Sequence, residues 1–118
     1  MAAPANRIHV ARQPILDHRQ QVAAYELLYR DGEAQRAYTG GTTQASARVL
    51  SDALVGMGLE TLTDGRRAFL NLSHDVLLSD ASSLLDAKAV VLEILEDVTA
   101  SPEVVAMCRS LRRRGYQI

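Results

Sequence analysis

The fold of this chain is decided by its strongest apolar run, Val90-Val91-Leu92-Glu93-Ile94-Leu95, and by the segment that follows it. Branched apolar side chains at nearly every position predict a strand. A helix start follows at Ser101-Pro102-Glu103, where a capping serine precedes a proline and an acid in the first turn. Three arginines at 112–114 and then Gly115 mark the end of this helix.

The same pattern of strand and helix extends toward the N-terminus. The run Ala68-Phe69-Leu70-Asn71-Leu72 predicts a short buried strand. Ser73 can cap a short helix that continues to about Leu78. Further upstream, apolar residues at helical spacing predict a helix over 43–57, which Gly58 would end.

The first part of the chain has the pattern of an antiparallel hairpin. Two apolar runs, 9–16 and 22–30, are separated by the turn Asp17-His18-Arg19-Gln20. Pro14 cannot donate to a sheet ladder, so it indicates a strand end or an edge position. The polar, glycine-containing stretch 31–41 predicts a loop.

The order of elements is strand, strand, helix, strand, helix, strand, helix. Alternating strands and helices predict an α/β fold, in which helices cover a parallel sheet. The last three residues, Tyr116-Gln117-Ile118, have the pattern of a strand that is just beginning.

The composition narrows the functional class. The chain has 118 residues, of which 47% are hydrophobic and 23% are charged, and a formal net charge of -1. These values are typical of one modest soluble domain, and we expect neither a membrane nor a nucleic-acid partner. The single cysteine, Cys108, excludes an internal disulfide and a cysteine zinc site. The N-terminus has no secretory signal pattern, so we expect a cytoplasmic protein.

Three apolar strand segments each contain a polar residue: Glu26, Asn71 and Glu93. Because the carboxyl ends of parallel strands share one edge of a sheet, these side chains are expected to converge. Their oxygen donors suit a hard cation such as Mg²⁺ or Mn²⁺, and Arg30 could contact an anion near it. The alternative is structural, because such residues also cap helices or pair with an arginine.

Four segments, taken in order, resemble the first half of an EAL domain. They are Arg12-Gln13-Pro14-Ile15, Tyr25-Glu26-Leu27-Leu28-Tyr29-Arg30, Phe69-Leu70-Asn71-Leu72-Ser73 and Val91-Leu92-Glu93-Ile94-Leu95-Glu96. The EAL family comprises cyclic di-GMP phosphodiesterases and their degenerate relatives. The likeness is strongest to the EAL-like part of EAL–HDOD signalling proteins, which have a similar Ala-Arg-Gln-Pro-Ile segment. The resemblance implies a partial (β/α) TIM-type barrel with an N-terminal antiparallel hairpin, its first strand antiparallel to the rest.

The resemblance also implies roles for six residues. The positions that match metal ligands, for Mg²⁺ or Mn²⁺, are Glu26, Asn71 and Glu93. The positions that match contacts to the dinucleotide are Gln13, Leu28 and Arg30.

The likeness covers residues 1–118 as the N-terminal half of an EAL-like domain, with the C-terminal half absent. The further ligands of the family's two-metal chemistry would follow the last residue, so we expect no useful phosphodiesterase activity from this chain alone. We also expect self-association through the exposed half-barrel edge at 90–96. The alternative is a non-catalytic protein-interaction or regulatory module of the EAL–HDOD type, which the altered segment Asp31-Gly32-Glu33 favours.

Overall fold

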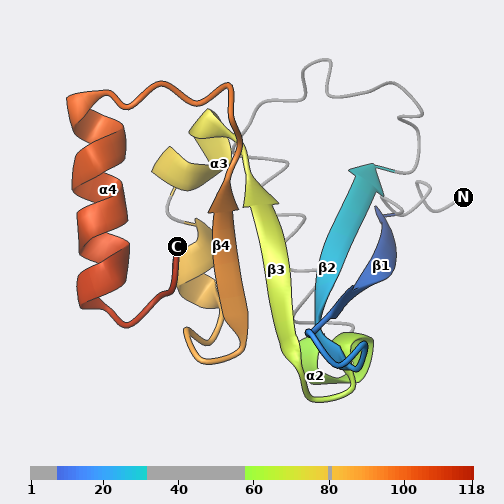
Figure 1. Cartoon of the computed structure of the whole chain (residues 1–118). Helices are drawn as coiled ribbons and strands as arrows, with labels where there is room; N and C mark the ends of the chain where they lie inside the picture. The colour runs from blue at the N-terminus through green and yellow to red at the C-terminus, as the bar shows by residue number, and fades with distance from the viewer. Residues whose placement is uncertain (1–7, 32–57, 80) are drawn as a thin grey trace, which may run out of the picture.

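The computed structural model of the chain describes residues 8–31, 58–79 and 81–118, and Figure 1 shows how their elements are arranged. The elements are, in chain order, β1 (Ile8–Leu16), β2 (Val22–Asp31), α2 (Leu59–Thr63), β3 (Arg67–Leu72), α3 (His74–Leu78), the 3₁₀ turn η1 (Ala81–Leu84), β4 (Val90–Ile94) and α4 (Pro102–Arg113). The strands form one mixed sheet in the order β1-β2-β3-β4. Only β1 is antiparallel to its neighbour, because β2, β3 and β4 are mutually parallel. The helix predicted over 43–57 and the loop predicted over 31–41 lie outside the described residues, except Asp31, which ends β2.

The predicted hairpin is confirmed, and its turn follows from one aspartate. The Asp17 carboxylate accepts hydrogen bonds from the backbone N–H groups of Arg19 (2.8 Å) and Gln21 (3.0 Å). Gln20 then takes a left-handed conformation with φ 61, which lets the chain reverse into β2. Pro14 lies within β1, at the edge of the described sheet, where a missing N–H donor is tolerated.

The strand over 67–72 and the helix after it form as their sequence predicts. The Ser73 hydroxyl accepts a hydrogen bond from the backbone N–H of Val76 at the start of α3. Ser101 caps α4 in the same way, by accepting from the N–H of Val104 at 3.2 Å. None of the helices in the described ranges is long and apolar enough to cross a membrane.

The chain returns to the sheet after α4. Gly115 has φ 95, a backbone conformation that favours glycine, and it ends the helix. Gln117 then pairs in parallel with Val91, and its carbonyl accepts from the N–H of Leu92 at 2.9 Å. The strand predicted to begin at Tyr116-Gln117-Ile118 is therefore confirmed at Gln117. The edge of β4, which was expected to be unpaired, is paired at Val91.

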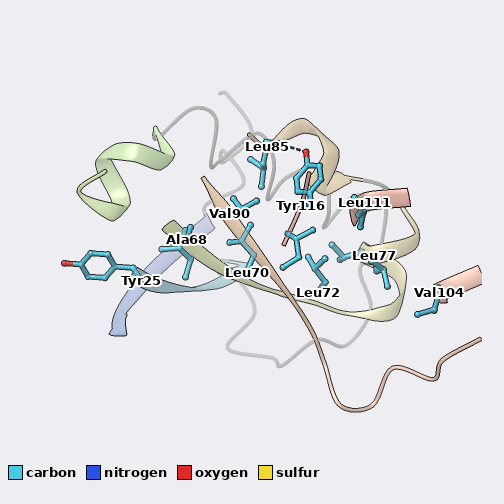
Figure 2. Packing of buried hydrophobic residues seen from close by; sticks show 13 residues of the cluster. Tyr25, Ala68, Leu70, Leu72, Leu77, Leu85, Val90, Val104, Leu111 and Tyr116 are labelled. Atoms are coloured by element: carbon cyan, nitrogen blue, oxygen red, sulfur yellow. Dashed lines mark hydrogen bonds between the residues drawn. The ribbon is translucent and has the colours of Figure 1, made fainter. Parts of the chain in front are cut away.

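The hydrophobic core lies between the sheet and the helices α3 and α4, as Figure 2 shows. Alternate residues of β3 point into it, because successive side chains of a strand face opposite ways. The Tyr116 hydroxyl donates a hydrogen bond to the buried carbonyl of Leu85, which holds the chain end against η1. Among the described residues, the largest side chains that are almost completely buried are Leu27, Leu70, Leu72, Leu77, Leu92, Leu111, Val90 and Thr63.

The helix α2 has no counterpart in the sequence prediction. Gly58 precedes α2 as its N-cap residue, with φ 79. The helix that Gly58 is predicted to end lies outside the described residues. Five residues are too few for a helical period to be recognised, so the sequence gives little indication of α2. The 3₁₀ turn η1 lies in the connection between α3 and β4.

Candidate functional site

The two faces of the sheet differ in character. The helices cover one face, which carries Leu27, Leu70 and Leu92. Residues of opposite parity lie on the other face, and these include Glu26, Asn71 and Glu93. This second face is called the polar face below. The three residues predicted from the sequence to converge therefore share one face of three neighbouring parallel strands.

Glu26 and Asn71 are in direct contact although they are 45 residues apart in the sequence. The Nδ2 amide of Asn71 donates a hydrogen bond of 2.9 Å to Oε1 of Glu26. This bond leaves the Asn71 amide oxygen and the second Glu26 carboxylate oxygen as acceptors. Glu93 is the register partner of Asn71 on β4, so it occupies the adjacent position on the same face. All three side chains are partly buried.

The negative charge of Glu26 affects the pKa of Glu93. Partial burial raises the pKa of the Glu93 carboxyl above its usual value, and the negative charge of Glu26 raises it further. Arg67 shares the polar face but lies at the opposite end of β3, about 13 Å from Asn71 at the usual rise per residue. Its guanidinium donates instead to the side chain of Gln117. The site thus concentrates negative charge.

This raised pKa predicts how stability changes with pH. Between the ordinary pKa of a glutamate and the raised pKa of folded Glu93, the folded state binds more protons than the unfolded state. The contribution of Glu93 to the free energy of unfolding is therefore lost as the pH rises through this window. We expect Glu93→Gln to remove that slope and to be more stable than the unmodified chain at neutral pH. Urea unfolding across a pH series measures the slope, and an identical slope in the variant would contradict the assignment.

The donors fit a hard divalent cation. Among the described residues, no three or more His, Cys, Asp or Glu side chains form a cluster that could hold a metal. The candidate set is instead two carboxylates and one amide, because Asn71 supplies the third oxygen. Mg²⁺ and Mn²⁺ take oxygen ligands of this kind, and Mg²⁺ usually keeps several waters in its remaining positions.

The residues expected to contact a dinucleotide lie at the same region of the sheet. Gln13 is the antiparallel register partner of Glu26, so the two share the polar face. Leu28 follows Glu26 by two residues, so it shares the polar face, and it is 42% exposed. Arg30 continues the same alternation in β2, where the structure describes only its backbone, paired with His9.

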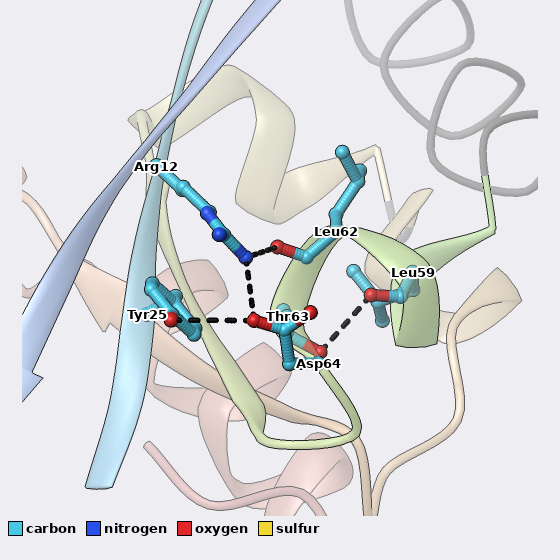
Figure 3. Close-up of polar contacts among 6 residues, drawn as sticks. All are labelled: Arg12, Tyr25, Leu59, Leu62, Thr63 and Asp64. Atoms are coloured by element: carbon cyan, nitrogen blue, oxygen red, sulfur yellow. Dashed lines mark hydrogen bonds and ion pairs between the residues drawn. The ribbon is translucent and has the colours of Figure 1, made fainter. Parts of the chain in front are cut away.

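A second polar cluster, which the sequence did not predict, lies on the opposite face and is drawn in Figure 3. The guanidinium of Arg12 donates to the carbonyl of Leu62 (3.1 Å) and to the Asp64 carboxylate (3.0 Å). It also lies over the ring of Tyr25, 4.4 Å from its centroid, while the Tyr25 hydroxyl donates to Asp64. These contacts fasten α2 to the hairpin. The signal that could have predicted this cluster is Arg12 itself, because an arginine inside a strand needs a polar partner.

The chain is similar to parts of two longer bacterial proteins. It is 36% identical over 112 residues to the uncharacterized protein YuxH of Bacillus subtilis, covering 95% of this chain and 27% of that protein. It is 31% identical over 110 residues to the cyclic di-GMP phosphodiesterase CdgJ of Vibrio cholerae, covering 92% of this chain and 25% of that protein. No family model matches the chain. The chain thus spans about a quarter of the length of each relative, and one of the two is a cyclic di-GMP phosphodiesterase.

Proposed function

We propose that this chain forms the N-terminal part of an EAL-like domain in a bacterial cyclic di-GMP signalling protein. In this proposal the mixed sheet is part of a TIM-type barrel, and its polar face points toward the barrel interior. Glu26, Asn71 and Glu93 would bind Mg²⁺ or Mn²⁺, and Gln13, Leu28 and Arg30 would contact the dinucleotide.

The observation that carries the proposal is the convergence of Glu26, Asn71 and Glu93 on one face of three adjacent parallel strands. Asn71 and Glu93 lie near the carboxyl ends of β3 and β4, and barrels and doubly wound sheets build their sites at such ends. Two carboxylates that repel each other gain most from a cation between them, which would neutralise their charge. The similarity to CdgJ supports the choice of cyclic di-GMP among the possible phosphodiester ligands.

Each side chain has a defined task in this proposal. The two glutamates would bind the cation directly, and the amide of Asn71 would hold Glu26 in position while its oxygen completes the set. A divalent cation there would supply charge neutralisation for a phosphodiester group. The Arg30 guanidinium suits a phosphate oxygen because it presents forked donors, and exposed Leu28 offers an apolar surface for a base.

The proposal predicts metal binding by this chain that depends on both glutamates. Electron paramagnetic resonance of free Mn²⁺ gives the affinity directly. We expect Glu26→Gln and Glu93→Gln each to weaken Mn²⁺ binding by about tenfold or more, because each removes a charged ligand. Glu103→Gln removes an exposed carboxylate of α4 and is expected to leave the affinity unchanged. Equal affinity in all four proteins would contradict the metal site.

Cyclic di-GMP is tested separately by isothermal titration with and without Mg²⁺. Metal-dependent binding that is lost in Glu26→Gln supports the proposal. An absence of binding, with Mn²⁺ affinity intact, would leave a metal site but contradict the dinucleotide assignment.

The second candidate function is a non-catalytic interaction module. The arrangement of α3 and α4 favours it, because the groove between these helices combines apolar residues with Arg114. This function does not depend on the metal site.

A further inference from the structure

A groove lies between α3 and α4, on the helix-covered side of the molecule. Its volume is about 560 Å³. Leu78 of α3 forms one wall of the groove. Residues of α4 and its C-terminal end form the other wall, and because they recur every three or four residues they lie in one stripe on one side of the helix. The stripe consists of Glu103, Ala106, Met107, Ser110 and Arg114. This groove is separate from the polar face, because the sheet lies between the two.

The groove is apolar at its centre and charged at its ends. Leu78, Ala106 and Met107 form the uncharged centre. Glu103 is the only acid of the lining and stands at the N-terminal end of α4, whereas Arg114 lies at the C-terminal end. A ligand would therefore meet apolar surface in the middle and positive charge toward one end.

Two further arginines strengthen that positive end. Arg109 and Arg113 follow Ala106 by three and seven residues, so they border the same stripe, and both are exposed. Neither forms an ion pair with a residue in the described ranges. Arg109, Arg112 and Arg113 of α4 and its C-cap residue Arg114, against one glutamate, make this helix and its end strongly basic in a chain whose net charge is -1.

We propose that this groove docks an acidic amphipathic segment of a partner protein. Apolar side chains of the segment would cover Leu78, Ala106 and Met107, and its carboxylates would face Arg109, Arg113 and Arg114. The charge complementarity selects this occupant. A second copy of α4 offers only one acid, Glu103, so it would leave most of the four arginines unmatched even when it runs antiparallel. A nucleic-acid strand would find an apolar centre with no aromatic ring for stacking.

The probe is a dye-labelled helical peptide with leucines along one face and glutamates along the other, and fluorescence anisotropy measures its affinity. We expect the unmodified chain to bind it, and we expect salt to weaken the binding. Ala106→Glu places a negative charge in the groove centre, which would repel the acidic peptide and should weaken binding about tenfold or more. Arg113→Glu reverses one charge at the positive end and should weaken binding several-fold. Arg19→Glu makes the same charge change at the hairpin turn and should leave the affinity unchanged.

Four results would overturn the proposal. The first is no binding of the peptide to a folded chain. The second is equal binding of a scrambled peptide of identical composition, which would show attraction by charge alone. The third is a loss of binding in Arg19→Glu that matches the loss in Arg113→Glu. Far-UV circular dichroism confirms that each variant is folded. A single-stranded oligonucleotide that binds more tightly than the peptide would assign the basic end of α4 to nucleic acid and also overturn it.

Discussion

Leu70→Ala is expected to lower the free energy of unfolding by about 2 to 5 kcal/mol. Leu70 is 1% exposed at the centre of β3, where it contacts the core formed with α3 and α4. Removing its side chain loses apolar burial and leaves a cavity that the close-packed surroundings only partly fill. Small domains are stable by only about 5 to 15 kcal/mol, so the loss is a large share of the total.

Leu84→Ala is the matched control, because Leu84 is 66% exposed in η1 and the same atoms are removed. We expect its effect to be about 0.5 kcal/mol or less. Urea unfolding followed by circular dichroism measures both variants. If Leu70→Ala does not fold, Leu70→Val gives the same comparison with a smaller cavity. Similar losses in the buried and exposed variants would show that β3 does not pack against the helices as described.

Asn71→Asp is expected to destabilise the chain by about 1 to 2 kcal/mol at neutral pH in the absence of metal. The aspartate cannot donate a hydrogen bond to Glu26, and it adds a third carboxylate beside two that already repel each other. In the proposed metal site, the same substitution adds a charged ligand. Saturating Mn²⁺ should therefore recover most of the lost stability, because binding to the folded state stabilises it.

Asn71→Leu separates these two effects. It also removes the hydrogen bond to Glu26 but adds no charge, so Mn²⁺ should recover little of its stability. Thermal unfolding with Mn²⁺ and with a chelator measures both variants. Equal responses of Asn71→Asp and Asn71→Leu to Mn²⁺ would contradict the assignment of position 71 as a metal ligand.

Much of this architecture follows from local sequence. The hairpin was predictable because Asp17 and the apolar runs on either side of it act over a few residues. The strands β3 and β4 and the helix α4 were predictable because their periods and caps are local as well. The convergence of Glu26, Asn71 and Glu93 followed from a general property of parallel strands, given that the strands are neighbours.

The features that were missed depend on contacts between distant residues. Arg12 meets Asp64 only once the hairpin and α2 are both in place, and no local pattern links them. The same is true of Arg67 and Gln117, which meet across β4. The exact pairing of charged side chains depends on the register between strands, which the turn sets only for β1 and β2.

We expect the two halves of the candidate site to come from parts of the chain that fold on different timescales. The β1–β2 hairpin has local contacts and can form within microseconds, whereas its parallel pairing with β3 must close a long loop. Because Asn71 and Glu93 are register partners on β3 and β4, we expect them to come together first, and Glu26 to join them when the hairpin docks. A cation held by all three residues would therefore bind late in folding. It would slow the undocking of the hairpin, and so the unfolding rate, and would leave the rate of folding nearly unchanged.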